Sequence, residues 1–313
     1  MYNRIKEIKC SPKELEEVRS RFLKQVESDP NSFDEADVEK VMKDEWTVKR
    51  FIGYKKNDLT DATTALTNSM KWRKSFGVSS IKATDFPAEF FWVGECHTYA
   101  RDKNNIATVY LRVKFHKQLM DWQPLIKKYL IYVMELMDEE IRNGADGWAL
   151  IYDCEGGTIF NNNMDLLFFL VQTFFEHYPM ALTYIGLYEL PWVLRAIYHI
   201  CRGWIPEDFR KLFIFLNKEN IASHVGSQFL PDYLSGTCSL RYRVRIDGCL
   251  PLPEFAEREN IKQSAVNKFM SHYEKFIKLA NEEERERELV ENVKSKTDST
   301  LHTFHGNNNT IKV

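Results

Sequence analysis

Apolar residues recur at helical spacing through the first part of the chain. The first set lies three or four positions apart and consists of Leu15, Val18, Phe22 and Val26. Ser11 and Glu14 precede it in the pattern of a capping box, and two further stretches with helical spacing follow at 34–51 and 60–77. We therefore predict that residues 1–84 form a helical N-terminal cap.

The pattern changes to short apolar runs of strand length between residues 85 and 240. We expect strands at 108–115, 148–152, 183–190 and 211–216, and helices at 125–141, 165–178 and 191–201. Strands that alternate with helices indicate a largely parallel sheet covered on both faces. The predicted fold class is α/β, with the helical cap followed by a mixed, mostly parallel sheet flanked by helices.

The C-terminal part is dominated by a charged helix that we expect from residue 254 onward. Its apolar positions form a narrow stripe of Ile261, Ala265, Phe269, Tyr273, Phe276 and Ala280. This stripe either packs on the preceding domain or binds a partner, as in a coiled coil. We assign a linker and this helix to residues 241–298, and a disordered tail to residues 299–313.

Composition narrows the class of protein. The 313 residues are 44% hydrophobic and carry 43 basic against 45 acidic side chains, so the chain has no overall charge for binding nucleic acid. The six cysteines are widely spaced, which is not a zinc-binding pattern and fits a reducing cytoplasm. No apolar run reaches the ~18 residues of a membrane span. We expect a cytoplasmic protein without metal or cofactor.

Catalytic motifs are also missing. The sequence has no glycine-rich dinucleotide or phosphate loop, no nucleophile elbow and no zinc-protease motif. Asp153, Glu155 and His177 are the one conceivable acid–base set, and a solvated carboxylate with a helix-terminal histidine is the simpler interpretation. We predict that the protein is not an enzyme.

Aromatic residues are concentrated from residue 168 to residue 215. Tyr184 and Tyr188 share a strand face with Gly186, and Phe213 and Phe215 share another, which is compatible with an ordinary aromatic core. The following segment mixes large apolar and basic side chains, which are Trp192, Arg195, Ile197, Ile200, Arg202 and Trp204. Such a mixture suits a surface that contacts lipid headgroups, although a buried helix is an equal alternative.

Several motifs together resemble the CRAL-TRIO lipid-binding family. In chain order they are Val48-Lys49-Arg50-Phe51-Ile52 with Lys55-Lys56-Asn57-Asp58-Leu59, Trp72 to Val78, Trp148 to Gly156, Tyr178-Pro179, Leu190-Pro191-Trp192 and Leu230 to Gly236. Each motif is loose, but their order and spacing are specific. The resemblance covers roughly residues 35–237.

The resemblance implies an apolar cavity floored by the sheet and covered by a mobile gate helix. On this chain the gate is about Trp192 to Phe209, with Trp192, Arg195, Ile197, Ile200 and Trp204 as its contact residues. We expect the ligand to be bound by Tyr184, Gly186, Tyr188, Lys211, Phe213 and Phe215. Lys211 matches a lysine that contacts the inositol phosphate in some members, whereas Met180 replaces their glutamate.

The implied function is binding or transfer of a phospholipid or similar hydrophobic ligand. The implied partners are the lipid and, transiently, a membrane surface, with peripheral association of a cytoplasmic protein. The alternative is a non-enzymatic adaptor that binds a protein partner through the C-terminal helix and retains a vestigial pocket. Nucleic acid is not an expected partner of either form.

Overall fold

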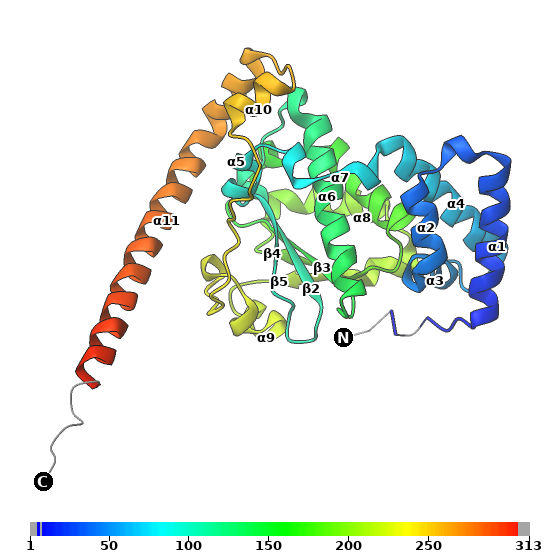
Figure 1. The fold of residues 1–313 in the computed structure, drawn as a ribbon, viewed down its shortest axis with the longest axis horizontal. Helices are drawn as coiled ribbons and strands as arrows, with labels where there is room; N and C mark the ends of the chain where they lie inside the picture. The colour runs from blue at the N-terminus through cyan, green and yellow to red at the C-terminus, as the bar shows by residue number, and fades with distance from the viewer. Residues whose placement is uncertain (1–4, 7, 306–313) are drawn as a thin grey trace, which may run out of the picture.

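The structure, a computed structural model, describes residues 5–6 and 8–305, with side chains described as far as Leu289 (Figure 1). The N-terminal cap consists of α1 (Pro12–Ser28), α2 (Glu35–Lys43), α3 (Glu45–Tyr54) and α4 (Leu59–Phe76). Ser11 and Glu14 form the expected capping box at the start of α1. The cap has its own hydrophobic cluster, which includes Val18, Phe22, Val41, Phe51 and Leu66. The helical cap is confirmed, while its boundary at residue 84 stays a prediction.

A mixed five-stranded sheet forms the centre of the second part. Its strands are β1 (Cys96–Tyr99), β2 (Ala107–Arg112), β3 (Trp148–Asp153), β4 (Leu182–Tyr188) and β5 (Phe213–Leu216), paired in that order. β1 pairs with β2 in antiparallel fashion and the other pairs are parallel. The mixed, mostly parallel sheet is confirmed. The edge strand β1 was not predicted.

The sequential strand order determines which face the crossover helices cover. Parallel connections are almost always right-handed, so sequential strands place every crossover helix on the same face. These helices are α6 (Gln123–Arg142), α7 (Met164–Gln172) and α8 (Arg195–Gly203), with a π-helical turn Thr173–His177 after α7. The opposite face is covered by α9 (Ile221–Val225) and the segment after it, in a separate hydrophobic cluster. Both faces are therefore covered, but by different kinds of structure.

The C-terminal part comprises α10 (Leu252–Arg258) and α11 (Gln263–His305), with α5 (Ala88–Val93) beside them. The stripe on α11 packs against the domain, because Ala265, Phe269, Tyr273 and Ala280 are buried. Trp122 Nε1 donates to the Ala265 carbonyl over 3.0 Å. The interpretation of the stripe as a packing surface is confirmed for these residues.

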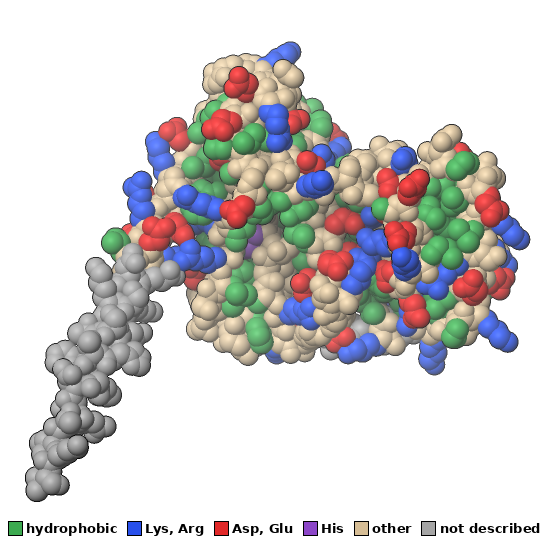
Figure 2. Space-filling model, viewed as in Figure 1, with side chains coloured by type: hydrophobic (Ala, Val, Ile, Leu, Met, Phe, Trp, Pro, Cys, Tyr) green, Lys and Arg blue, Asp and Glu red, His purple; other side chains and the backbone are tan. Residues whose placement is uncertain are grey.

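The helix α11 also leaves the domain and extends away from it (Figure 1). It continues to His305, beyond the predicted end of the charged helix at residue 298, and residues 306–313 of the predicted tail lie outside the described residues. Figure 2 shows acidic and basic side chains intermixed over the cap and along the described part of α11 in this view. Among the described residues, no helix is long and apolar enough to cross a bilayer.

Candidate functional site

An apolar cavity of about 80 Å³ lies between the crossover face of the sheet and α8. Its floor is formed by Leu150, Ile185 and Leu187, and its walls by side chains of α7 and α8. A second cavity, of about 60 Å³, lies toward β2 and α11 and shares Leu167, Leu170 and Tyr152 with the first. These walls favour a hydrocarbon ligand, because they offer few hydrogen-bond partners to a polar one.

The helix α8 covers the first cavity with one face and is exposed on the other. Ile197 and Tyr198 contribute to the cavity wall, whereas Trp192 and Ile200 are 82% and 49% exposed. Arg195 and Arg202 are also exposed. The Trp204 ring makes an edge contact with Phe168 on α7, with ring centroids 5.2 Å apart. This combination of exposed apolar and cationic side chains is typical of a surface that meets lipid headgroups.

The predicted ligand-binding face of β4 is not the face that borders the cavity. Tyr184 and Tyr188 belong to the cluster under α9, on the opposite side of the sheet from Ile185 and Leu187. A Cβ atom at Gly186 would lie 2.6 Å from Leu216 Cδ1, which is also on the α9 side. The predicted ligand residues of β4 therefore lie on the face away from this cavity, and their role in binding stays a prediction. The sequence could not distinguish the two faces, because all seven residues of β4 are buried and neither face is marked as polar.

The other predicted ligand residues do not lie together in the structure. Phe213 lines the cavity, whereas Phe215 is 57% exposed and packs against Tyr198 with ring centroids 5.4 Å apart. Lys211 lies in the 3₁₀ turn before β5 and not in the cavity. Of the six predicted residues, one lies in the apolar lining.

Lys211 instead borders an open groove between the cap and the sheet domain. The groove has a volume of about 670 Å³, and its lysines are Lys9, Lys55, Lys56 and Lys211. Lys56 also forms an exposed ion pair with Asp208 over 2.9 Å. Met180 forms part of the wall with φ at 64°, in the left-handed region. The Lys55-Lys56 turn belongs to a recognisable sequence motif, but the sequence alone does not indicate a site there, because the groove is formed by segments that are far apart in the chain.

The ring of Phe209 separates this groove from the apolar cavity. Its centroid lies 5.7 Å from Tyr54 in the groove wall and 5.1 Å from Phe175 in the cavity wall. Phe209 follows α8 at the end of the predicted gate. A displacement of this segment would therefore join the basic groove to the cavity.

The conceivable acid–base set is not assembled. Asp153 lies at the carboxyl end of β3, where Oδ1 accepts from the Glu155 backbone N–H over 3.0 Å. His177 precedes β4, at the opposite end of the parallel strands, and stacks on Trp72 with ring centroids 3.8 Å apart. Burial raises the pKa of Asp153, but no histidine of this set is near enough to exchange a proton with it. Within the described residues, no group of three or more His, Cys, Asp or Glu side chains could hold a metal.

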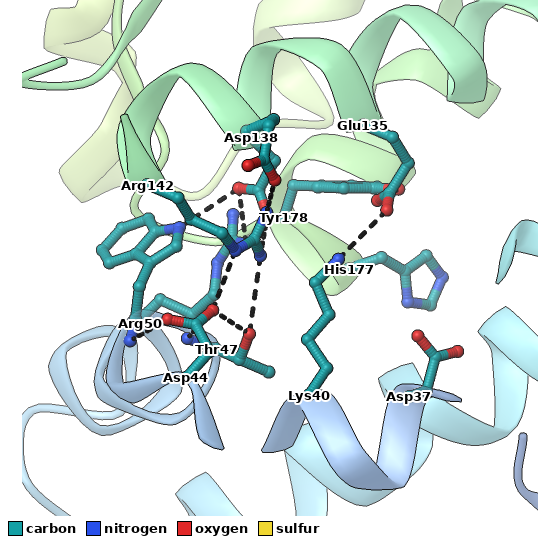
Figure 3. Close-up of polar contacts among 12 residues, drawn as sticks. Asp37, Lys40, Asp44, Thr47, Arg50, Glu135, Asp138, Arg142, His177 and Tyr178 are labelled. Carbon is teal, nitrogen blue, oxygen red and sulfur yellow. Dashed lines mark hydrogen bonds and ion pairs between the residues drawn. The ribbon is translucent and has the colours of Figure 1, made fainter. Parts of the chain in front are cut away.

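A buried polar network joins the cap to the sheet domain (Figure 3). Arg50 of α3 pairs with Asp138 of α6 over 2.7 Å, and their side chains are 4% and 3% exposed. Trp46 Nε1 also donates to Asp138. Arg73 of α4 bridges Asp37 and Glu135 over 2.8 and 2.7 Å. These contacts fix α3, and with it the Lys55-Lys56 turn, against the sheet domain.

Comparison with known proteins agrees with this architecture. Residues 94–236 match the CRAL/TRIO domain. CRAL-TRIO domain-containing protein C3H8.02 of Schizosaccharomyces pombe is 22% identical over 197 residues, which cover 56% of this chain and 44% of that protein. Phosphatidylinositol transfer protein CSR1 of Eremothecium gossypii is 21% identical over 199 residues, covering 60% of this chain and 46% of that protein. The chain thus spans less than half the length of these relatives.

The fold is also found among solved structures. The crystal structure of Sfh5 superposes with a TM-score of 0.53 at 15% sequence identity, covering 81% of this chain and 99% of that chain. At this level of identity the superposition shows a shared fold. Residues 94–236 are therefore similar in sequence to the CRAL/TRIO domain, and the superposed structure has the same fold.

Proposed function

We propose that this protein binds a lipid and carries it between membranes, with the apolar part in the cavity beneath α8. The observation that carries the proposal is the amphipathic helix α8, which covers an apolar cavity on one side and exposes Ile200 on the other, with the exposed Trp192 in the 3₁₀ turn just before it. The related protein CSR1 of Eremothecium gossypii is a phosphatidylinositol transfer protein, which supports the same function. Domain boundaries after residues 84, 240 and 298, and a cytoplasmic location, remain predictions within this proposal.

Lipid entry requires a change of conformation. The two cavities of about 80 and 60 Å³ hold at most a few water-sized groups, which is far less than an acyl chain needs. The segment 192–209 is the element whose movement would enlarge them, since it carries few buried side chains. Each methylene group removed from water contributes ~0.8 kcal/mol, so a long chain can compensate for opening the site. Contact of Trp192 with a bilayer would favour the open form.

A cavity-filling substitution tests the proposal. We expect Leu187→Phe to lower the amount of lipid that co-purifies with the protein by about tenfold, because the larger ring occupies space on the cavity floor. Extraction followed by mass spectrometry measures the loading, and fluorescent-lipid transfer between vesicles measures the activity. Hydrogen exchange over residues 192–209 should increase when vesicles are added.

The matched control is Tyr184→Phe, which changes the same strand on the face under α9 and should leave loading unchanged. Wild-type protein that carries no lipid and transfers none would contradict the proposed function. Equal loss of lipid in both variants would show that β4 packing, and not the cavity, controls binding.

The basic groove is proposed to hold the phosphate of the lipid. A charge-assisted hydrogen bond contributes ~1.5–3 kcal/mol, so Lys211→Ala and Lys56→Ala should each weaken binding of phosphatidylinositol by about 10- to 100-fold. Lys218→Ala is the control, because this exposed lysine pairs with Glu155 at the other end of β5. Competition between phosphatidylinositol and phosphatidylcholine distinguishes recognition of inositol from contact with any phosphate. Unchanged binding of both lipids would remove the groove from the site.

Two finer relationships remain proposals. The segment Leu190–Thr237 resembles the CRAL-TRIO part of motile sperm domain-containing protein 2 more closely than the family in general. A protein partner for α11 would have to use surfaces other than the packed stripe, such as the exposed Leu279 and Leu289. The adaptor function is thus the weaker alternative, since the domain itself occupies the stripe.

A further inference from the structure

The strand β5 lies at one edge of the sheet and is paired along one side, with β4. In a parallel pair, the backbone groups of alternate residues point to the neighbouring strand, and those of the residues between them point away. The Leu216 carbonyl accepts from the Glu189 N–H at the end of β4 over 2.9 Å, so Leu216 and Ile214 face β4. The backbone N–H and C=O groups of Phe213 and Phe215 therefore point to the open edge.

An open groove of about 540 Å³ borders this edge on the side of α9. Its lining includes Ile214 of β5, Lys211 just before the strand and Lys103 from the turn before β2. The Phe215 carbonyl accepts from Asn220 Nδ2 over 3.4 Å, which is long for a hydrogen bond, so another donor can replace this contact. The edge is thus accessible to an extended chain.

The two faces of the sheet differ beside this edge. Side chains alternate along a strand, so Phe215 lies on the α8 side and Ile214 on the α9 side. Phe215 is 57% exposed, and its ring lies 5.4 Å from that of Tyr198. A strand added at the edge continues the alternation. One set of its side chains would therefore contact these aromatic rings, and the other set would lie over the groove.

The groove favours negative charge. Its described lining includes Lys103 and Lys211 but neither aspartate nor glutamate. Lys103 Nζ donates to the Ser223 carbonyl, which is a neutral partner. The neighbouring Asp102 is 3% exposed, and its oxygens accept from two backbone N–H groups and from the Tyr184 hydroxyl. The charge of Lys103 is therefore available to a carboxylate from outside the chain.

We propose that β5 binds an extended segment of a partner protein in which acidic and apolar residues alternate. The segment adds a strand to the sheet through the backbone groups of Phe213 and Phe215. Its acidic side chains meet Lys103 and Lys211, and its apolar side chains meet the exposed ring of Phe215. A second copy of β5 fits less well, because it carries no acidic residue. This protein-binding site does not depend on the proposed lipid binding.

Three fluorescein-labelled peptides test the inference on the full-length protein. In the first, valine and glutamate alternate. In the second, lysine replaces glutamate, and the third is the acidic peptide with alternate backbone nitrogens methylated. Loss of a charge-assisted contact or of backbone hydrogen bonds should each weaken binding by about tenfold, so the first peptide should bind most tightly. Fluorescence anisotropy measures the three affinities.

Two variants at one position separate the backbone from the side chain. Phe215→Pro removes the outward N–H and leaves the hydrogen bonds to β4, as proline can at a sheet edge. Phe215→Ala loses the same ring but keeps the N–H. The acidic peptide should bind the proline variant about tenfold more weakly than the alanine variant. Circular dichroism establishes that both variants are folded.

A charge reversal tests the groove. Lys103→Glu should reverse the preference between the acidic and the lysine peptide, because it places a carboxylate in the lining. Lys103 is chosen because Lys211 also borders the basic groove beside the cap. The control is Lys13→Glu, an exposed change on α1 that should leave the preference unchanged.

Amide exchange in the wild-type protein gives a readout that needs no variant. Binding of the acidic peptide should slow the exchange of the Phe213 and Phe215 amides by about tenfold, as measured by NMR. The Ile214 and Leu216 amides already face β4 and should change little. A bound peptide that leaves the outward amides unprotected would overturn pairing at this edge.

The remaining outcomes also decide the proposal. Equal affinity for the acidic and the lysine peptide would overturn the assigned charge of the partner. Equal binding by Phe215→Pro and Phe215→Ala would overturn the backbone pairing. If no peptide binds, the short strand and its flanking lysines block the edge and the proposal fails. Self-association that Phe215→Pro abolishes would identify a second copy as the occupant, which contradicts the proposed partner.

Discussion

Replacing Asp138 by alanine should lower the free energy of unfolding by about 3–5 kcal/mol, because it leaves a buried arginine without its counter-charge. Arg50 is 4% exposed and its guanidinium lies 2.7 Å from Asp138. Arg142 Nη2 contacts the other carboxylate oxygen, also over 2.7 Å. Burial alone would raise the pKa of Asp138, but the two guanidiniums outweigh it and lower that pKa, so the group is ionised at neutral pH. Urea denaturation measures the change.

The exposed pair of Lys43 with Glu39 provides a matched control. Its side chains are 75% and 62% exposed, so Lys43→Ala should cost less than about 1 kcal/mol. Asp138→Asn should fall between the two variants, because the amide can still accept from Arg50 but carries no charge. If Asp138→Ala lowers the free energy of unfolding by no more than Lys43→Ala does, the buried network does not contribute the expected stability.

The second large effect is a loss of stability between pH 6.5 and pH 4. Burial, with a smaller contribution from Arg73, lowers the pKa of His177 to about 4, and burial with Arg112 lowers the pKa of His97 to about 3. His97 is held as a neutral ring: Nδ1 lies 3.2 Å from the Gly94 carbonyl, and the Tyr233 hydroxyl lies 3.2 Å from Nε2.

The direction of this effect follows from proton binding. Above pH ~6.5 both histidines are neutral in the folded and the unfolded chain, and the stability that they contribute is fully present. Below that value the unfolded chain binds protons that the folded chain excludes, so the free energy of unfolding falls. Each pH unit costs ~1.4 kcal/mol per histidine, which gives about 3 kcal/mol for each at pH 4.

Thermal melts from pH 7.5 to pH 4 measure this dependence. His177→Phe retains a flat ring against Trp72 but cannot titrate, so it should remove part of the slope between pH 6.5 and pH 4. A melting temperature that is constant over this range, or a slope that His177→Phe leaves unchanged, would show that these histidines are not excluded from protonation.

Local sequence signals were sufficient to predict most of the helices and strands. The Ser11–Glu14 box starts α1, and Gly77 ends α4 with φ at 77°, a conformation that glycine adopts without a steric penalty. In β2, Val109 and Leu111 lie two positions apart and pack together on the crossover helices, as expected for one face of a strand. These features depend on residues within one or two turns of each other, which is why they could be predicted.

The edge strand β1 and the boundary between two neighbouring helices were harder to predict from the sequence. β1 has four residues, and it pairs along one side with β2, so it leaves a weak pattern in the sequence. The separation of α10 from α11 at residues 259–262 was also missed, because the charged composition continues across it. In both places the local pattern is compatible with more than one structure, and tertiary contacts select one.

By itself, the sequence determined the α/β class, the helical cap, the order of the elements and the resemblance to the CRAL-TRIO family. Only the tertiary structure decided which face of β4 borders the cavity, because both faces are buried and the choice depends on the handedness of the crossovers. It also brought Lys55 and Lys56 to Lys211, more than 150 residues later in the chain. Periodicity indicates that a residue is buried but not which distant residues lie beside it, so the groove could be found only from the fold.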